Sequence, residues 1–223
     1  MTLPTLDDTE RRVVGALAEK ALATPDQYPL LLNALRAACN QKTAREPVMD
    51  LGEREVTDAL LRLQRRGLAG TTSGSGHRVS KFRHTLDRAL DLSRRELAVL
   101  CVLLLRGAQT SGELRQRTAR LADFASVEAV EEALWMLGDR DDPIVQTLPR
   151  GPGQSTDRYA HTLGGSDGHE QAAGDDSGAD DPEPRSRPDT SGAGPNLGAR
   201  VEALETEVAA LRASLEAFRA QFE

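Results

Sequence analysis

Side chains able to neutralise phosphate groups gather in the first half of the chain. Arg and Lys recur at two places there, and these are the residues with which proteins contact nucleic-acid backbones. One group falls on a predicted helix and the other on a predicted hairpin. The candidate nucleic-acid-binding residues are Arg54, Arg62, Arg65, Arg66, His77, Arg78, Lys81 and Arg83.

A polar stretch from Asn40 to Pro47 is a second candidate site. On a functional interpretation, it forms a recognition loop for nucleic acid or peptide. On a structural interpretation, Asn40 and Gln41 satisfy carbonyl groups at the end of a helix, and Arg45 pairs with Glu46 or Asp50. Both interpretations stay open. The candidate loop residues are Asn40, Gln41, Lys42 and Arg45.

Residue patterns typical of catalysis or metal binding are not found. The histidines have no cysteine or carboxylate partner at metal-ligand spacing, and no serine lies in a nucleophile-elbow context. The glycines of residues 73–76 precede a predicted strand rather than a helix, which argues against a phosphate loop. We therefore expect no enzymatic activity, no cofactor and no metal. We expect His84 and His161 to hold strand ends through backbone hydrogen bonds.

Composition places further limits on the protein. Cys39 and Cys101 lie in apolar helical patterns, which predicts two reduced, buried thiols. The chain starts without a signal-peptide pattern, and its longest apolar run, Leu97 to Leu105, is too short to span a bilayer. These features predict a cytoplasmic protein without membrane contacts. The net charge of −7 argues against massive non-specific binding of nucleic acid, although a local basic face remains compatible with it.

The apolar residues of the first 90 positions follow a helical period three times and then a strand period twice. Caps and breakers agree with this pattern, because an aspartate precedes the first helix and Gly67 follows the third. The predicted elements are a helix from Asp7 or Asp8 to about Leu22, helices over about 29–41 and 51–66, and strands over 68–72 and 78–86.

The same order returns in residues 91–163. We expect the lone Trp135, which follows Leu134 in the third helix, to be a core or inter-domain anchor. The predicted elements are a helix from Asp91 or Ser93 to Leu105, a short helix over 111–117, a helix over 127–138 capped by Ser126, and strands over 144–148 and 158–163.

Short sequence echoes indicate that the two halves arose by duplication. Phe82-Arg83-His84-Thr85-Leu86 is matched by Tyr159-Ala160-His161-Thr162-Leu163 at the end of the second half. The apolar spacing of the third helices also matches. Three helices followed by a hairpin is the order of a winged helix, in which the second and third helices form a helix-turn-helix.

The last 60 residues differ from the rest in composition. Gly, Asp, Ser and Pro dominate residues 164–197, which predicts a disordered linker. Residues 198–223 carry an a/d heptad pattern, which favours a parallel two-stranded coiled coil and a homodimer. A single amphipathic helix docked on its own chain is the alternative. The candidate dimerisation residues are Val201, Leu204, Val208, Leu211, Leu215, Phe218 and Phe222.

Four strings in the first half, residues 24–30, 33–35, 38–42 and 45–48, resemble the YceH family of bacterial proteins. The similarity extends over roughly residues 5–163. It implies two tandem winged-helix domains and no established activity. The acidic linker and the terminal heptads look like an addition to the family core.

Together these features predict a mainly α protein with small β-hairpins, of the α+β class. The predicted domains are a first winged helix (1–90), a second winged helix (91–163), the linker (164–197) and the coiled-coil helix (198–223).

Two functions fit this organisation. The first is a DNA-binding or transcription-associated protein that uses the wing and third helix of its first domain. The carboxylates of Glu53, Glu55 and Asp58 weaken this hypothesis, because they would lie near phosphates. The second is a protein-interaction scaffold, which the acidic third helix of the second domain favours.

Overall fold

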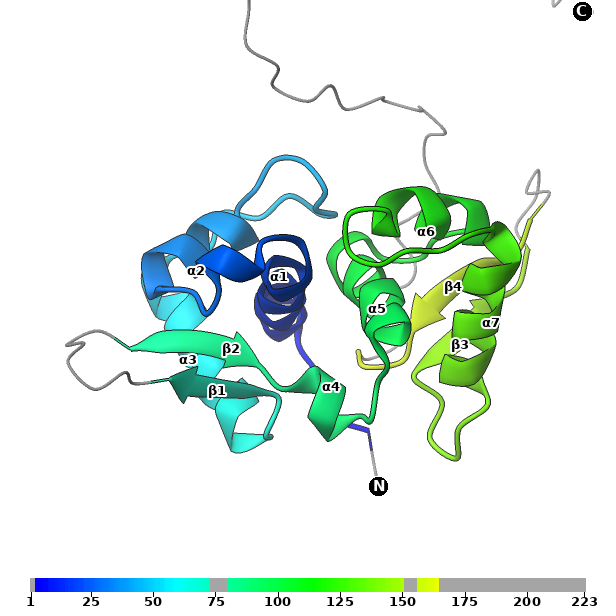
Figure 1. Ribbon diagram of the computed structural model, residues 1–223. Helices are drawn as coiled ribbons and strands as arrows, with labels where there is room; N and C mark the ends of the chain where they lie inside the picture. Colours follow the sequence, from blue (N-terminus) through cyan, green and yellow to red (C-terminus); the bar gives the residue numbers. More distant parts are fainter. Residues whose placement is uncertain (1–2, 73–79, 151–155, 165–223) are drawn as a thin grey trace, which may run out of the picture. The chain divides into compact units, whose positions relative to one another are not determined.

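The computed structural model describes residues 3–72, 80–150 and 156–164. These residues belong to one compact unit that spans residues 1–175, and residues 176–223 make up a second unit. Apart from Gly164, the predicted linker and coiled coil lie outside the described residues, as do all the predicted dimerisation residues. The described part combines helices with two antiparallel hairpins (Figure 1), which confirms the α+β class.

Three helices and a hairpin occur in the same order twice, and the short helix α4 precedes the three helices of the second copy. The first copy contains α1 (Asp8–Ala23), the 3₁₀ helix η1 (Pro25–Gln27), α2 (Leu32–Cys39), α3 (Glu53–Arg65), β1 (Ala69–Thr72) and β2 (Lys81–His84). The second contains α4 (Leu86–Ala89), α5 (Arg94–Arg106), α6 (Ser111–Thr118), α7 (Val127–Gly138), β3 (Val145–Leu148) and β4 (Arg158–His161).

Capping boxes begin the first helix of each copy. The Asp7 carboxylate accepts from the Glu10 amide at 2.7 Å, and the Glu10 carboxylate accepts from the Asp7 amide at 3.0 Å. Ser93 and Glu96 make the same two bonds at the start of α5. Each box satisfies amides that the helix leaves without a partner. The structure thus selects Asp7 and Ser93 from the predicted pairs of caps.

Helix α2 begins later than predicted because the chain before it is extended. Leu30 and Phe82 exchange both backbone hydrogen bonds, at 3.0 and 2.8 Å, and so form a bridge to β2. An extended Leu30 excludes a helix that starts at residue 29. Gln109 and Tyr159 form the matching bridge in the second copy, at 3.0 and 2.7 Å. Each hairpin therefore has a third, very short extended neighbour.

The threonine of each sequence echo closes its hairpin. The Thr85 amide donates to the Leu68 carbonyl at 3.0 Å, and its hydroxyl donates to the Gly67 carbonyl at 2.6 Å. Thr162 makes the equivalent bonds to the carbonyls of residues 144 and 143, at 2.9 and 2.5 Å. We had assigned this closure to the histidines. It is the threonine hydroxyl, one residue later, that reaches the carbonyl next to the strand.

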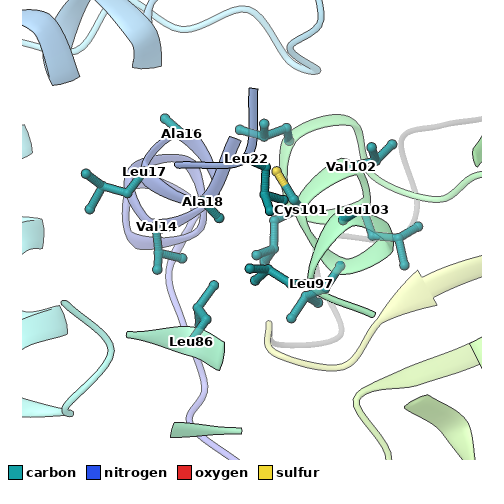
Figure 2. Close-up of a cluster of buried hydrophobic side chains, with 14 of the residues drawn as sticks. Val14, Ala16, Leu17, Ala18, Leu22, Leu86, Leu97, Cys101, Val102 and Leu103 are labelled. Carbon is teal, nitrogen blue, oxygen red and sulfur yellow. The ribbon is translucent and has the colours of Figure 1, made fainter. Parts of the chain in front are cut away.

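The two copies share one core, in which α1 packs along α5 (Figure 2). Val14, Ala18 and Cys101 are fully buried there, and Leu86 of α4 lies beside them. Gly15 permits the close approach, because a methyl group on it would lie 3.0 Å from the Leu105 side chain. The boundary that we predicted at residues 90 and 91 stays a prediction.

The N-terminal segment also joins the two copies. The Leu6 amide donates to the Leu163 carbonyl at 2.8 Å, and Leu6 pairs with Gly164 as a parallel bridge. The leucine that ends the second echo is fully buried by this arrangement. Within the described residues, no helix has the length and apolar character needed to cross a membrane.

Candidate functional site

Two of the predicted phosphate-binding arginines hold α3 against the start of α1. Arg62 donates to the Asp7 carboxylate at 2.8 Å and to Glu10 at 3.2 Å. Arg66 donates to the Thr5 carbonyl and lies 3.6 Å from Glu10. Because the Glu10 carboxylate is buried, these pairs join the capping box of α1 to the end of α3. Both guanidinium groups are therefore engaged within the protein.

Arg140 makes an equivalent contact in the second copy. It donates to the Glu96 carboxylate at 2.8 Å and to the Leu90 and Asp91 carbonyls at 2.6 and 3.0 Å. Burial opposes the ionisation of Glu96, but hydrogen bonds from Ser93 and Arg140 outweigh it and lower the pKa of this carboxyl group. The end of α7 is thus tied to the start of α5, as α3 is tied to α1.

The other predicted phosphate-binding residues of α3 and β2 differ in exposure. The Arg54 side chain is 94% exposed and lies 3.8 Å from the Asp58 carboxylate. Arg65 and Lys81 are exposed, and the half-buried Arg83 packs across Gly70. The two remaining residues, His77 and Arg78, lie outside the described residues. Of these other predicted residues, Arg54, Arg65 and Lys81 are thus the described ones that are exposed.

The predicted recognition loop is largely engaged in holding the end of α2. Arg45 is buried and donates to the Ala38 carbonyl at 3.0 Å. It also binds both oxygens of Glu19, at 3.0 and 2.5 Å. The partner is therefore Glu19 of α1, rather than Glu46 or Asp50 as the structural interpretation proposed. The Gln41 side-chain oxygen accepts from Arg45 at 2.7 Å.

Other polar residues around this loop also form hydrogen bonds within the protein. Asn40 donates to the Leu51 carbonyl at 2.9 Å and accepts from the Leu51 amide at 2.8 Å. Arg12, which we did not single out, is buried and donates to the Cys39 carbonyl at 3.0 Å. Asn40, Gln41 and Arg45 are all engaged within the protein, but of these only Arg45 satisfies a carbonyl at the end of α2, whereas Asn40 binds the Leu51 backbone and Gln41 binds Arg45. Lys42 is exposed.

The histidine of the first echo lies in a packed, polar corner. The His84 amide donates to the Tyr28 hydroxyl at 2.6 Å, and the His84 ring lies 3.7 Å from the Asp87 carboxylate. Burial lowers the pKa of His84. The Tyr28 hydroxyl is thus engaged within the protein. Among the described residues, no group of His, Cys, Asp or Glu has a metal-binding arrangement.

Both cysteines are free and buried, as predicted. Burial raises the pKa of Cys39 to about 12 and also raises that of Cys101. The Cys101 thiol donates to the Gly15 carbonyl at 3.4 Å, inside the contact between α1 and α5. Reactive cysteines are partly exposed and have lowered pKa values, so these two thiols have the properties of core residues.

Trp135 lies on the outer face of α7, which corrects our expectation of a core or inter-domain anchor. Its exposure is 61%, and that of its neighbour Met136 is 48%. The buried face of α7 consists of Val130, Ala133, Leu134 and Leu137. A residue directly after Leu134 points away from this face because successive helical residues are about 100° apart.

Carboxylates surround these two apolar side chains on α7. The spacing of the exposed residues is three, one, three, one and three, which places them on one helical face. Glu131 accepts from the Ser111 hydroxyl of α6 at 3.0 Å, and the others face solvent. The exposed residues of this face are Glu128, Glu131, Glu132, Trp135, Met136 and Asp139.

Helix α3 exposes an apolar side chain at the matching position. Leu61 follows the buried Leu60 just as Trp135 follows Leu134, and it is 46% exposed. Its charged neighbours on the outer face are of both signs, namely Arg54, Asp58 and Arg65. The third helices of the two copies therefore share an exposed apolar residue and differ in the charge around it.

Comparison with known proteins places the chain among proteins without an assigned activity. A family model described as "Protein of unknown function, DUF480" matches residues 6–154. A UPF0502 protein of Shewanella oneidensis is 46% identical over 211 residues, which cover 93% of this chain and 94% of the relative. UPF0502 proteins of Azoarcus sp. and Geobacter sulfurreducens are also 46% identical, each over 98% of this chain and over 94% and 98% of their own lengths.

The family model ends at residue 154, before the acidic linker and the terminal heptads, which we expect to be an addition to the family core. Because the two longer alignments cover 98% of this chain, they must reach well beyond residue 164. The C-terminal part of the sequence is therefore shared with these relatives.

Proposed function

We propose that the chain, which belongs to the DUF480 family of proteins of unknown function, is a non-enzymatic protein. It consists of two tandem winged-helix modules, and these modules contact other proteins. The proposal includes the resemblance to the YceH family. It also includes the predicted homodimer, which rests on the heptads of residues 198–223.

The element order and the small bridges support the winged-helix assignment. In each copy, three helices precede a hairpin, and the chain just before the second helix bridges the second strand of that hairpin. The bridges join Leu30 to Phe82 and Gln109 to Tyr159. A short strand before the helix-turn-helix, paired with a two-stranded wing, fits this fold.

The exposed apolar residue on each third helix carries the functional proposal. In DNA-binding winged helices this helix enters the major groove, where cationic and polar side chains are needed. Here it presents Leu61 in one copy and Trp135 in the other. Exposed Trp and Met side chains are enriched at protein interfaces. Two of the three arginines at the end of α3, Arg62 and Arg66, are bound to Asp7 and Glu10 instead.

Affinity purification of the full chain from native lysate tests this function. The wild type is expected to retain specific proteins, and the double variant Leu61→Glu/Trp135→Glu is expected to lose them. Val48→Glu is the matched control, because Val48 is 58% exposed but lies outside the third helices. Recovery of nucleic acid alone, without protein, would refute the proposal.

DNA binding through the first module is the second candidate. The observation in its favour is that Lys81 on β2 and Arg65 at the end of α3 are both exposed. Each lysine or arginine that contacts a phosphate contributes to the salt dependence of binding. A salt titration of wild type and Arg65→Ala/Lys81→Ala should then show a shallower slope for the variant, by roughly one to two phosphate contacts. An unchanged slope, or the absence of binding at low salt, would count against this candidate.

A further inference from the structure

We propose that the outer face of α7 is a docking site for a basic amphipathic helix of a partner protein. This inference rests on the proposed function and adds the site and the chemistry of the partner. The α7 face, as we call it, consists of Glu128, Glu131, Glu132, Trp135, Met136 and Asp139.

The α7 face combines an apolar centre with an acidic surround. Trp135 and Met136 lie one helical turn after Glu131 and Glu132, and Asp139 lies a further turn along. In the described part of the chain, none of the carboxylates of this face forms an ion pair. Their charge is therefore available to a partner.

The nearby cations are engaged elsewhere. Arg140, at the end of α7, binds Glu96 and three backbone carbonyls. Arg115 of α6, which lies toward the Glu128 end, donates to the Ala125 carbonyl at 3.3 Å. The α7 face thus keeps a net negative charge although arginines flank it.

This arrangement selects a partner by two properties. Burial of an indole and a thioether supplies affinity, since aromatic and methionine side chains contribute strongly at interface centres. The surrounding carboxylates attract Lys and Arg and repel phosphate, so they disfavour nucleic acid as the occupant. An arginine of the partner can also stack on the indole of Trp135.

A helix is the partner shape that suits a convex helical face. Two helices pack when rows of side chains spaced three and four residues apart interlock. A partner helix with one apolar stripe between rows of basic residues would cover Trp135 and Met136 and place its cations beside the carboxylates. The corresponding face of α3 carries charges of both signs, so a second copy of this chain is a poorer match.

The chain contains a single tryptophan, so its fluorescence reports on the α7 face directly. The probes are a synthetic helical peptide with a leucine stripe flanked by lysines, and a matched peptide in which every lysine is glutamate. With the full chain, we expect the lysine peptide to shift Trp135 emission to shorter wavelength in a saturable manner. The glutamate peptide should cause no shift.

Charge variants of the full chain make the test specific. Glu131→Lys/Glu132→Lys should weaken binding of the lysine peptide at least tenfold. Glu53→Lys/Asp58→Lys changes the net charge equally but on α3, and should keep the affinity within about threefold of wild type. Circular dichroism checks that both variants are folded.

Several outcomes would overturn the inference. These are no emission shift with the lysine peptide, equal binding of both peptides, or equal loss in the two charge variants. A blue shift that follows protein concentration without peptide would instead identify a second copy as the occupant. Partner proteins that co-purify with wild type and with Glu131→Lys/Glu132→Lys alike would refute the α7 site while leaving the proposed function intact.

Discussion

Arg140 and Glu96 connect the end of α7 to the start of α5 through a 2.8 Å ion pair. The first copy has the same connection between Arg66 and Glu10, at 3.6 Å. In each case the carboxylate also closes a capping box, so one side chain serves a helix start and a tertiary contact. The internal repeat thus extends from apolar spacing to a specific polar contact.

Loss of this contact should destabilise the fold. We expect Arg140→Met to lower the free energy of unfolding by about 1–3 kcal/mol, because Glu96 and three carbonyls lose their donor. Arg54→Met is the control, since Arg54 is highly exposed and should change stability by less than about 0.5 kcal/mol. Urea unfolding at neutral pH measures both.

The difference in the free energy of unfolding between wild type and Arg140→Met should also depend on pH. A carboxyl group whose pKa is lowered in the folded state stabilises it above its unfolded pKa of about 4.3, and this contribution is lost as the pH falls. The free energies of unfolding of the two proteins should therefore converge at acidic pH. A constant difference down to low pH would show that Arg140 acts through packing alone.

Two glycines in helices should respond in opposite directions to alanine. Gly15→Ala places a methyl group 3.0 Å from Leu105 in the contact between α1 and α5, and we expect a net loss of about 1–2 kcal/mol. Gly112 of α6 has open space around it, so Gly112→Ala should gain about 0.5–1 kcal/mol from helix propensity. Thermal unfolding of both variants measures these changes in stability. Stabilisation by Gly15→Ala would show that the two helices can separate at little cost.

The two thiols should be inert in the native protein. An exposed thiol is about half ionised at pH 8.5, whereas burial raises the pKa of Cys39 to about 12 and that of Cys101 as well. We therefore expect no reaction with a thiol reagent at pH 8.5 until denaturant is added, when both should react. Rapid native labelling of either cysteine would contradict the burial.

The same shifts set the sign of a pH effect at the alkaline end. A thiol whose pKa is raised by folding stabilises the native state fully below its unfolded pKa of about 8.5. This contribution is lost as the pH rises, because the unfolded chain releases its thiol protons first. Cys39→Ala/Cys101→Ala should therefore show a weaker alkaline loss of stability than wild type.

Trp135 should behave as a solvent-exposed residue in the free chain. Its exposure of 61% predicts emission at long wavelength and efficient quenching by iodide and acrylamide. Quenching by the neutral acrylamide should exceed that by iodide, because Glu131 and Glu132 repel the anion. Protection of Trp135 from both quenchers would show that its face is already covered.

Leu134→Ala, on the buried side of α7, is a contrasting change that should reduce the free energy of unfolding by about 2–5 kcal/mol.

Local features of the sequence predicted the helices and hairpins well because they depend on neighbouring residues. The capping boxes at Asp7 and Ser93 are set by residues three positions apart. Two element boundaries differ clearly from the prediction: α2 starts late because of a bridge between Leu30 and Phe82, and the strand predicted to reach residue 86 ends at His84, since Leu86 begins α4. No residue close to position 30 in the sequence indicates that Phe82 is its partner.

The candidate site was harder to predict because charge alone does not show where a side chain is engaged. Arg62 and Arg66 look like phosphate ligands in the sequence, yet their carboxylate partners lie in α1. The outward direction of Trp135 could have been recognised, since the apolar period of α7 already has its own buried residues. We gave more weight to the usual burial of tryptophan than to this period.

The sequence by itself determined the order of helices and hairpins, their duplication, and the burial of Cys39 and Cys101, because helical and strand periods act over a few residues. Only the tertiary structure decided which charged groups are engaged. Folding brings Arg45 to Glu19 and Arg140 to Glu96, and among the described residues it gives the carboxylates around Trp135 no ion pair. Those pairings depend on how α1, α5 and the third helices pack, which is set by contacts between residues far apart in the chain.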